Sequence, residues 1–399
     1  MNKYNEHFLL DTESVKDYVV SKLNYFKPEE NIDAQEIGDG NINYVFKVWN
    51  PLTGKSIIVK QADKLLRSSG RPLDMYRNRI EAEILKIQRN LAPEYVPEIY
   101  FYDENMYVLA MEDISEFKNM RTEMLNGKIF AHFSDNVSTF LADTLIPTTD
   151  LFISRSEKKN NVKKFMNPEL CDISEDLVFT EPYWDYKKRN IILKENLDFV
   201  KENLYDDKVL HFEVAKLRDR FMNYPQALIH GDLHSGSIFA NDSGIKIIDP
   251  EFAFYGPIGY DSGNVIGNLC MSWVNKEFTD ASNQHFIDWI KASILDIMIK
   301  LESKITTKLK ESTENGLYKY SFKQFYTNSI IEDTYGYAGT EIIRRVVGDS
   351  KVKEVTSVED PVTRIPMERA MIKVGIYLIK NRYNSIDLND LQKIINVEK

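Results

Sequence analysis

The residues best suited to chemistry lie in two acidic motifs, each at the end of an apolar run. The first motif is His230-Gly231-Asp232-Leu233-His234, and the second is Asp249-Pro250-Glu251. Phosphoryl transfer needs a carboxylate that orients the acceptor hydroxyl and accepts its proton, and carboxylates that hold Mg²⁺ on the β- and γ-phosphates of a nucleotide. Mg²⁺ usually takes only one or two protein carboxylates. Either motif alone could be an ordinary turn, where Asp is common. The two motifs together favour a phosphoryl-transfer site in which Asp232, Asp249 and Glu251 supply these carboxylates.

The histidines of the first motif raise the alternative of a zinc site. His230 and His234 are four residues apart, as two ligands on a helix would be. Gly231 and Gly236 disfavour a helix there, and a third ligand is not obvious in the sequence. We expect instead that His230 orients the turn through a backbone hydrogen bond.

A glycine-rich segment and a lysine near the N-terminus could hold phosphates. Gly38-Asp39-Gly40-Asn41 lies between two strand-like runs, so it fits neither the dinucleotide-binding pattern nor the P-loop. A hairpin turn would explain the glycines alone. However, Lys60 ends the apolar run Ile57-Ile58-Val59, where a buried ammonium is costly unless it is paired. Phosphate oxygens and a helix carboxylate are the usual partners of such a lysine. The helical wheel allows either Glu81 or Glu83 as that carboxylate.

The segments that must position these residues change in character near residue 112. A leading helix is predicted from about Ser14, because Ser14 and Asp17 have capping-box spacing. Up to that point the pattern predicts strands over 43–49, 56–60, 99–102 and 106–111 and a helix over 80–91. Helical patterns dominate afterwards, apart from a strand-like stretch over 227–248. We predict an α+β fold with a small antiparallel-sheet N-lobe, residues 1–111, and a larger, mainly helical C-lobe, residues 112–399.

Two adjacent arginines lie in an apolar helical pattern near the C-terminus. Arg344 and Arg345 follow Ile342-Ile343 and precede Val346-Val347. Successive helix positions point about 100° apart, so solvent can reach one of the two side chains more easily than both. A buried guanidinium needs an anion or several acceptors. For such a pair alone, a structural ion pair with an Asp or Glu is the simplest account.

Composition limits the class of protein. The 399 residues are 43% hydrophobic and 28% charged, a composition and length typical of a globular protein of two or more domains. The formal net charge of −10 gives no basic field for nucleic acid. The two cysteines, Cys171 and Cys270, are too few for a disulfide framework or a cysteine-rich zinc site. No signal-peptide pattern or apolar run of membrane-spanning length is present, so we expect a cytoplasmic protein without nucleic-acid or membrane partners.

Longer motifs resemble one family. The matching runs are Gly38 to Phe46, Lys60-Gln61-Ala62, Met111-Glu112-Asp113, Asn167 to Ile173, His230 to His234, Asp249 to Asp261 and Glu341 to Arg345. Together they are similar to the S-methyl-5-thioribose kinases, in the aminoglycoside-phosphotransferase-like branch of the protein-kinase fold. These enzymes use ATP to phosphorylate the anomeric hydroxyl of methylthioribose in methionine salvage. The resemblance therefore implies a bilobal protein-kinase-like fold, ATP and Mg²⁺ as cofactors, a small sugar as substrate and a homodimer.

The resemblance also implies roles for individual residues. Asp232 would act as the catalytic residue on the substrate hydroxyl, and Arg344 and Arg345 would line the substrate pocket with it. Asp249 and Glu251 would hold the metal. The residues implied to contact ATP are Gly38, Gly40, Asn43, Lys60, Glu112, Asp113, Ile114, Asp249, Pro250 and Glu251. Of the two helix carboxylates, the resemblance favours Glu81, and we expect Asp261 to brace the turn that carries Asp232.

The chain departs from its wider class at two places and from its close relatives at a third. Ser237 stands where related kinases have an Asn that binds a second metal ion, and Glu251 replaces the usual glycine of the Asp-x-Gly triplet. A carboxylate at that position could restore the lost ligand. The third departure is Arg71-Pro72-Leu73, where relatives are expected to have a Trp before Pro-Leu.

Two alternatives have to be weighed. A choline, homoserine or aminoglycoside kinase would share the fold, but a cationic acceptor favours an acidic pocket, and the pair of arginines argues against one. An ATP-binding pseudokinase would act as a scaffold, but Lys60, Asp232, Asp249 and Glu251 are all present.

Overall fold

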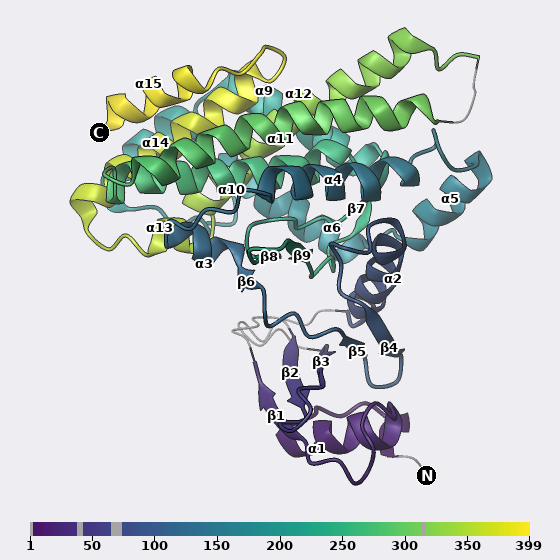
Figure 1. Cartoon of the computed structure of the whole chain (residues 1–399). Coiled ribbons are helices and arrows are strands. Elements are labelled where there is room, and N and C mark those ends of the chain that lie inside the picture. Colours follow the sequence, from purple (N-terminus) through teal and green to yellow (C-terminus); the bar gives the residue numbers. More distant parts are fainter. Residues whose placement is uncertain (1–2, 38–42, 65–73, 313–315) are drawn as a thin grey trace. The chain divides into compact units, whose positions relative to one another are not determined.

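The computed structural model describes residues 3–37, 43–64, 74–312 and 316–399. The chain divides into two compact units (Figure 1). The first unit comprises Met1–Phe117 together with Lys246–Phe252, and the second comprises Lys118–Ile245 and Ala253–Lys399. The segment Lys246–Phe252 is far in sequence from the rest of the first unit, and it carries the second acidic motif.

The first unit is built on a five-stranded sheet. The strand order is β1-β2-β3-β5-β4, and all neighbouring strands are antiparallel. The elements in chain order are η1 (Lys3–Asn5), α1 (Thr12–Asp17), η2 (Tyr18–Lys22), β1 (Asp33–Glu36), β2 (Tyr44–Trp49), β3 (Ser56–Gln61), α2 (Tyr76–Leu91), β4 (Ile99–Asp103) and β5 (Val108–Met111). The predicted strands and the helix between them are all present.

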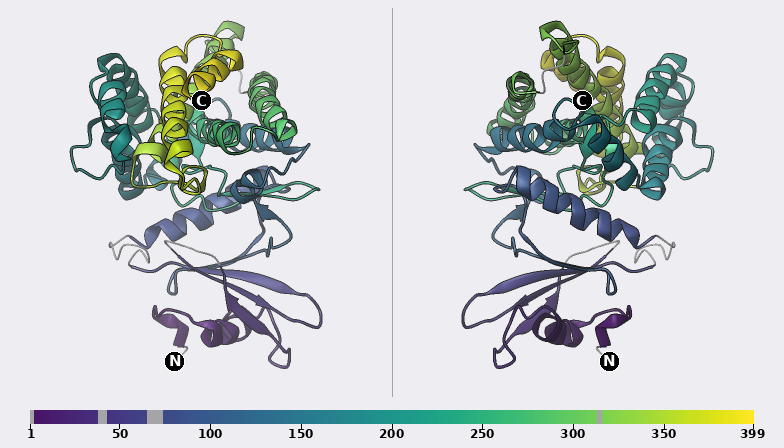
Figure 2. Two further views of the ribbon diagram at one scale, coloured as in Figure 1. Left: turned by 90° about the vertical axis from the view of Figure 1, so that its left-hand side faces the viewer. Right: turned by 90° about the vertical axis from the view of Figure 1, so that its right-hand side faces the viewer.

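The two faces of this sheet are covered by different helices. On one face, alternate residues of the strands pack with the leading helix into a core of Val15, Val19, Phe46, Val48, Ile57, Val59, Val108 and Ala110. Since successive side chains in a strand point to opposite faces, Lys60 lies on the other face, in register with Leu109 of β5. Figure 2 shows α2 on the side of the sheet opposite α1. Acidic residues of α2 therefore come within reach of Lys60.

The leading helix begins earlier than predicted. The N-cap of α1 is Asp11, whose Oδ1 accepts the backbone N–H of Ser14 at 2.7 Å, while Ser14 Oγ accepts the N–H of Asp11 at 2.8 Å. The capping box is thus formed by Asp11 and Ser14, and the predicted box of Ser14 and Asp17 is wrong. Asp is as good an N-cap as Ser, so Ser14 takes the N3 position of the box instead.

The second unit is mainly helical, as predicted. Its helices are α3 (Met120–Leu125), α4 (Phe133–Leu145), α5 (Arg155–Lys164), α6 (Pro168–Ser174), α7 (Glu181–Trp184), α8 (Leu197–Val200), α9 (Lys208–Asn223), α10 (Ile258–Thr279), α11 (Gln284–Lys310), α12 (Tyr320–Val347), α13 (Lys353–Thr356), α14 (Pro361–Asn381) and α15 (Leu388–Glu398). Short 3₁₀ or π turns are η3 (Ile146–Thr148), η4 (Glu175–Thr180), η5 (Lys194–Asn196) and η6 (Lys201–Tyr205). Its short strands are β6 (Lys118–Asn119), β7 (Ala227–Ile229), β8 (Ile238–Ala240) and β10 (Phe254–Gly256), and β9 (Ile245–Ile247) begins in this unit and ends in the segment Lys246–Phe252.

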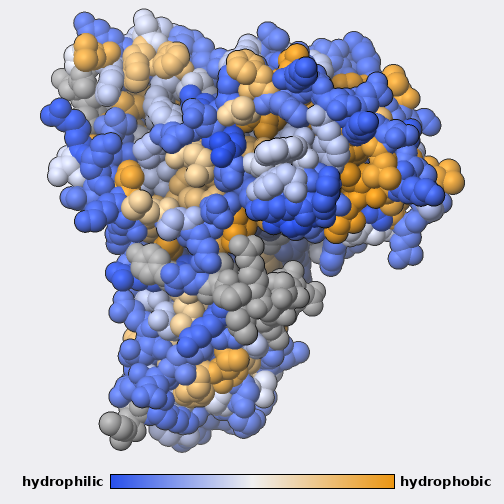
Figure 3. Space-filling model, turned by 180° about the vertical axis from the view of Figure 1, so that it is seen from behind, coloured by the Kyte–Doolittle hydropathy of each residue, from blue (hydrophilic) through white to orange (hydrophobic). Residues whose placement is uncertain are grey.

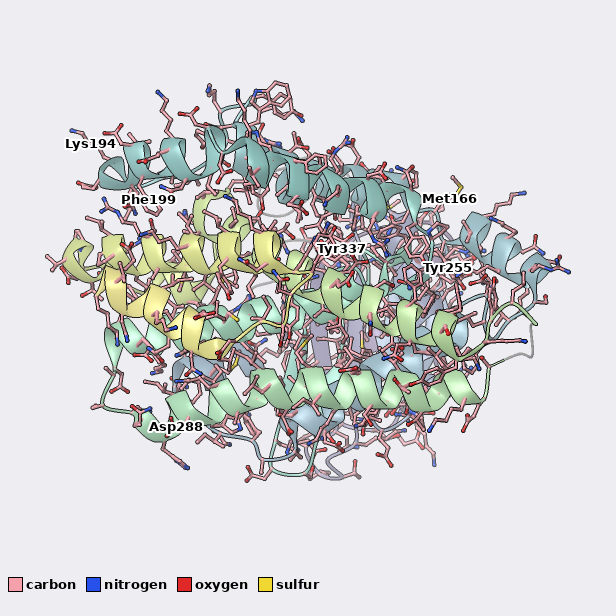
Figure 4. All side chains as sticks on the ribbon, turned by 90° about the horizontal axis from the view of Figure 1, so that it is seen from above. Met166, Lys194, Phe199, Tyr255, Asp288 and Tyr337 are labelled. Carbon is pink, nitrogen blue, oxygen red and sulfur yellow. The ribbon has the colours of Figure 1, made fainter. Side chains whose placement is uncertain are left out.

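Helices α10 and α12 approach closely because glycines of α10 face the contact. Gly259, Gly263 and Gly267 recur at every fourth position, and a Cβ atom at each would lie 2.5, 2.6 and 2.8 Å from atoms of α12. Any side chain there would push the helices apart. Tyr337, on α12, is fully buried at the centre of the helices of this unit (Figure 4). The close approach also brings Glu341 of α12 against Gly267.

The surface mixes hydrophobic and hydrophilic side chains. Figure 3 shows this mixture over one face of the molecule. In the part of the chain that the structure describes, no helix is both long enough and apolar enough to span a membrane.

Candidate active site

Lys60 lies at the centre of the predicted residues in the first unit. Its side chain on β3 is buried, and its Nζ lies 2.7 Å from Oε1 of Glu81 on α2 and 2.5 Å from Oδ1 of Asp249. Burial alone would lower the pKa of Lys60, but the carboxylates of Asp249, Glu81 and Glu251 raise that pKa above its ordinary value. Lys60 is therefore a charged side chain held between carboxylates. We call Asn43, Lys60, Glu81, Asp249 and Glu251 the Lys60 cluster.

The structure decides between the two candidate helix carboxylates. Glu81 is buried beside Lys60. Glu83 instead pairs with Arg79, one turn earlier on the same helix, at 3.2 Å. The expected pairing of Lys60 with Glu81 is confirmed, and the reason is that only Glu81 lies on the face of α2 that covers the sheet.

The backbone at Asp249 is in a conformation that is rare for this residue type. Its φ angle is +65°, in the left-handed region, although it is followed by Pro250. A residue before proline normally adopts an extended conformation. Such outliers cost about 1–3 kcal/mol and cluster at functional sites. Here the conformation accompanies the contact of the Asp249 carboxylate with Lys60, while the side chain keeps 45% of its surface exposed.

Glu251 is held by two residues that are distant in sequence. Its Oε2 lies 3.4 Å from Nδ2 of Asn43, at the start of β2, and 3.5 Å from Nε of Arg77, in the first turn of α2. Arg77 also donates to Oδ1 of Asn43 at 3.2 Å. All three side chains are buried. Sequence reasoning singled out Asn43 and Glu251 and missed Arg77, which lies one helical turn before Glu81 and could have been found by that spacing.

The residues expected to contact adenine form a separate group in the first unit. Oε2 of Glu112 accepts the backbone N–H of Glu98 at 2.9 Å and lies 3.5 Å from Nζ of Lys246. Asp113 pairs with Lys47 at 2.8 Å, and although burial raises the pKa of Asp113, hydrogen bonds from Lys47 and serine side chains bring it below its ordinary value. Ile114 follows directly. Gly38, Gly40 and the segment Arg71-Pro72-Leu73 lie outside the described residues.

The donors at Asp249 and Glu251 fit Mg²⁺. Both are carboxylates, which are the hard oxygen ligands that this ion takes. The partly open side chain of Asp249 leaves room for the water and phosphate ligands that Mg²⁺ keeps in nucleotide sites. Ser237, which replaces the expected Asn ligand, uses its hydroxyl to donate to the backbone carbonyl of Asp232 at 3.0 Å.

In the second unit, Asp261 braces the turn that carries Asp232. Asp261 of α10 accepts the backbone N–H groups of His230 at 2.7 Å and Gly231 at 2.9 Å. Gly231 has a φ of +82°, which glycine adopts without strain. Burial raises the pKa of Asp261 to about 7, although the two backbone donors act in the opposite direction. The expected bracing role of Asp261 is confirmed.

His230 orients the same turn, as predicted. The backbone N–H of Asp232 donates to its Nδ1 at 3.3 Å, and the ring is fully buried. Within the described ranges, no group of three or more His, Cys, Asp or Glu side chains is arranged to hold a metal ion. The third ligand that a zinc site would need beside His230 and His234 is thus not found there.

Arg344 and Arg345 share the carboxylate of Glu341, and both also lie near Asp232. Glu341 lies one turn earlier on α12, where its Oε2 accepts from Nε of Arg344 and its Oε1 accepts from Nε of Arg345 at 2.9 Å. Nη2 of Arg344 lies 3.4 Å and Nη2 of Arg345 lies 3.7 Å from Oδ1 of Asp232. We call Asp232, Glu341, Arg344 and Arg345 the Asp232 cluster. Sequence reasoning gave Glu341 no role, although its i, i+3 and i, i+4 spacing to the arginines was visible.

The charges of this cluster keep Asp232 ionised. Burial would raise the pKa of Asp232, but His234, Arg345 and Arg344 lower it well below its ordinary value. Burial also raises the pKa of Glu341, and the two arginines outweigh this effect and lower it to about 2. Asp232 is therefore a carboxylate that can accept a hydrogen bond from a bound hydroxyl.

His234 is a further neighbour of Asp232 that sequence reasoning weighed only as a metal ligand. Its Nδ1 accepts the backbone N–H of Gly236 at 3.0 Å, so in the neutral ring the proton is on Nε2, which lies 3.4 Å from Oδ2 of Asp232. A Cβ atom on Gly236 would come within 2.8 Å of the ring. Gly236 thus gives the ring room beside Asp232.

The structure therefore gathers the predicted residues into two clusters. The Lys60 cluster lies in the first unit and offers one cation, one amide and carboxylates suited to a metal ion. The Asp232 cluster lies in the second unit and offers a carboxylate acceptor with two guanidinium groups. A cation beside carboxylates that are suited to a metal ion fits a nucleoside triphosphate, and a carboxylate beside arginines fits a hydroxyl that receives a phosphoryl group.

Known proteins match the chain over nearly its whole length. A family model described as "Phosphotransferase enzyme family" matches residues 160–292. The methylthioribose kinase of Geobacillus thermodenitrificans is 34% identical over 386 residues, covering 96% of this chain and 96% of that protein. That of Bacillus pumilus is 35% identical over 379 residues, covering 94% of each, and that of Cronobacter sakazakii is 35% identical over 362 residues, covering 88% and 89%.

Solved structures give weaker similarities. An ethanolamine kinase of Plasmodium vivax is 15% identical, covers 95% of this chain and 91% of its own, and has a TM-score of 0.48. A glucosamine kinase is 11% identical, covers 96% and 85%, and also has a TM-score of 0.48. The relatives in sequence show the family, and this confirms the predicted protein-kinase-like fold class. The chain belongs to the methylthioribose kinase family.

Proposed function

We propose that this chain transfers the γ-phosphoryl group of ATP to the anomeric 1-hydroxyl of S-methyl-5-thio-D-ribose, giving S-methyl-5-thioribose 1-phosphate and ADP in methionine salvage. Its membership in the methylthioribose kinase family supports this reaction. The observation that carries the proposal is that Arg344 and Arg345 lie beside Asp232. A carboxylate with two cations suits a neutral sugar that is becoming a phosphate ester, and it disfavours a cationic acceptor such as choline or an aminoglycoside.

The Lys60 cluster would bind the nucleotide. Lys60 and Asn43 would contact ATP, and Glu112, Asp113 and Ile114 would hold the adenine, with Gly38, Gly40 and Pro250 as further contacts. Asp249 and Glu251 would hold Mg²⁺, which when bound neutralises charge on the phosphates and orients them. In this proposal residues 1–111 form the ATP-binding lobe, to which Asp249 and Glu251 contribute from the segment Lys246–Phe252.

The Asp232 cluster would bind the acceptor. Asp232 would accept a hydrogen bond from the 1-hydroxyl and orient its oxygen toward the γ-phosphorus. It would take the hydroxyl proton as the new O–P bond forms and the bond from the γ-phosphorus to the departing ADP oxygen breaks. Arg344 and Arg345 would stabilise the charge on the transferring phosphoryl oxygens and hold sugar hydroxyls. In this proposal residues 112–399 form the catalytic and substrate-binding lobe.

Replacing Glu251 with Gly recreates the commoner Asp-x-Gly triplet and removes one proposed metal ligand. Glu81, the other carboxylate of the Lys60 cluster beside Asp249, is buried and paired with Lys60, so we expect it not to replace the lost ligand. The Mg²⁺ concentration for half-maximal activity should rise by about tenfold or more. A Mg²⁺ titration at fixed ATP measures this, and an unchanged midpoint would show that Glu251 is not a ligand.

Replacing each arginine with Lys should distinguish the roles of the two side chains. Arg345 has partners at all three nitrogens: Glu341 at Nε, Asp232 at Nη2 and the Ser350 carbonyl at Nη1, at 3.1 Å. Among the described residues, Arg344 has partners at Nε and Nη2 alone, which are Glu341 and Asp232. We therefore propose that Arg344 contacts the phosphoryl group and that Arg345 mainly positions Arg344. Arg344→Lys should lower kcat by about tenfold or more, because the planar fork is lost while the charge is kept.

The matched variant Arg345→Lys should lower the melting temperature and raise KM more than it lowers kcat. A double-mutant cycle of the two Lys variants measures their coupling. Wild-type kinetics in both single variants, with only a lower melting temperature, would mean that the pair is structural.

We also propose, on the family resemblance alone, that the protein is a cytoplasmic homodimer. Sedimentation equilibrium tests the second part: a mass of twice 46.5 kDa is expected, and a monomer at micromolar concentration would contradict it.

The substrate assignment is tested by an ADP-release assay with Mg²⁺ and ATP across methylthioribose, other ribose derivatives, choline, homoserine and aminoglycosides. Methylthioribose should give the highest kcat/KM by at least about a hundredfold over the cationic acceptors, because they would meet the two arginines at the Asp232 cluster. Equal or faster turnover of a cationic acceptor would contradict the assignment.

A further inference from the structure

Arg77 is a buried cation of the first unit that the proposed roles leave unused. Its side chain is 2% exposed. The guanidinium donates to the backbone carbonyls of Asp74 at 2.9 Å and Asp63 at 3.2 Å and to Oδ1 of Asn43 at 3.2 Å, and its Nε lies 3.5 Å from Oε2 of Glu251. A cation in the first turn of a helix is disfavoured by the helix dipole. The contacts of Arg77 with residues outside α2 therefore explain its position better than the helix itself does.

Arg77 contacts two members of the Lys60 cluster, Asn43 and Glu251. Asn43 is an expected ATP contact at the start of β2, and Glu251 is a proposed metal ligand at the end of the segment Lys246–Phe252. With Oδ1 of Asn43 turned toward Arg77, the Nδ2 of the same amide faces Glu251 at 3.4 Å. Arg77 thus fixes which way the Asn43 amide points and holds the Glu251 carboxylate at the same time.

The charges around Glu251 are nearly balanced. Among the described residues of the cluster and its neighbour Arg77, three carboxylates, those of Glu81, Asp249 and Glu251, face the two cations Lys60 and Arg77. When all five groups are ionised, they together carry one net negative charge. Without Arg77 the same groups would carry two, and a divalent cation would be attracted more strongly.

We propose that Arg77 is a positioning residue that holds Glu251 and suppresses metal binding until the nucleotide is present. The inference rests on the proposed role of Glu251 as a metal ligand. In the nucleotide-free protein, the guanidinium neutralises Glu251 and repels a divalent cation. The phosphates of ATP then bring negative charge of their own, so the metal binds with the nucleotide and not before it.

This arrangement makes metal and nucleotide binding cooperative. In a linked system each ligand raises the affinity for the other by the same factor. Removing the Arg77 charge should reduce that factor, because the protein alone would then attract the metal. A purely structural Arg77 would change the stability of the unit without changing the cooperativity.

The test is Mn²⁺ binding to the full-length protein without nucleotide, followed by electron paramagnetic resonance of free Mn²⁺. Arg77→Met should lower the dissociation constant of Mn²⁺ about tenfold, and Arg77→Lys, which keeps the charge, should stay within about threefold of the wild type. With a non-hydrolysable ATP analogue, the further gain in Mn²⁺ affinity should be about tenfold smaller in Arg77→Met than in the wild type. Arg77→Gln removes the charge but keeps a polar side chain, and it carries the same test if Arg77→Met does not fold.

Two further variants separate the outcomes. Arg79→Met, on the exposed side of the same helix, should leave Mn²⁺ binding unchanged. Glu251→Gln should weaken Mn²⁺ binding with the nucleotide analogue; if it does not, the metal role of Glu251 itself is wrong. If Glu251→Gln weakens binding while Arg77→Met and Arg77→Gln leave the nucleotide-free affinity unchanged or lower it, the inference about Arg77 fails alone. If neither Arg77→Met nor Arg77→Gln folds, Arg77 likewise has a structural role.

Discussion

Replacing Asp232 with Asn should lower kcat for methylthioribose by at least about a hundredfold, the usual contribution of a positioned base. The amide is nearly isosteric, but it cannot take the hydroxyl proton, and it removes the charge that faces Arg344 and Arg345. ATP binding should stay within about threefold of the wild type, because the Lys60 cluster is made by residues of the first unit. Steady-state kinetics and calorimetric titration with a non-hydrolysable ATP analogue measure the two effects.

A matched control for this variant is Asp242→Asn, in an exposed turn of the same unit, where the side chain is 93% exposed. It should keep wild-type kinetics. If Asp232→Asn retained more than about a tenth of the wild-type kcat, a loss of only about 1.4 kcal/mol, Asp232 would not be the base.

Replacing Glu341 with Gln should have the largest effect on stability. Glu341 is buried and holds both arginines of the Asp232 cluster. Removing its charge leaves two buried guanidinium groups with Asp232 as their remaining carboxylate partner, and breaking a buried ion pair in this way costs about 3–5 kcal/mol. Activity should also fall, because the arginines lose the group that sets their position. Denaturant unfolding followed by tryptophan fluorescence measures the stability at pH 7.

The same variant should change the response to acid. The pKa of Glu341 is about 2 in the folded protein, below its ordinary value of 4.5. A carboxyl group with a lowered pKa stabilises the fold fully above its unfolded pKa, and this stabilisation is lost as the pH falls from about 4.5 toward 2. The loss of stability between pH 5 and pH 3 should therefore be smaller in Glu341→Gln than in the wild type.

Glu332→Gln, on the same helix, is the control for both measurements, since Glu332 lies outside the Asp232 cluster and is partly exposed. It should leave stability and acid response close to those of the wild type. An equal loss in both variants would mean that Glu341 has no special role.

Some parts of the site could be predicted because local rules decide them. Lys60 stood out as a charged residue at the end of an apolar strand, and burial of that strand forces a paired partner. The choice between Glu81 and Glu83 could not be made from the helical wheel, since both lie near the apolar face. The sheet decides it, because α2 covers the face on which Lys60 lies and turns Glu81 toward it.

Other parts depend on contacts between distant segments. Nothing in the local pattern of Lys246–Phe252 shows that it packs with the first unit, so the contacts of Asp249 with Lys60 and of Glu251 with Asn43 and Arg77 could be reached only through the family resemblance or the structure. The start of α1 was misplaced for a simpler reason. Asp11 and Ser14 satisfy the capping rule as well as Ser14 and Asp17 do.

Phosphorylation of methylthioribose at its anomeric hydroxyl is tested most directly by the ³¹P spectrum of the product. After incubation with Mg²⁺, ATP and methylthioribose, a sugar phosphate signal coupled to the anomeric proton should appear in equal amount to ADP. In the same time Asp232→Asn should give at least about a hundredfold less of both. A phosphate signal coupled to any other sugar proton, or ADP formed with inorganic phosphate alone, would show that the protein does not catalyse this reaction.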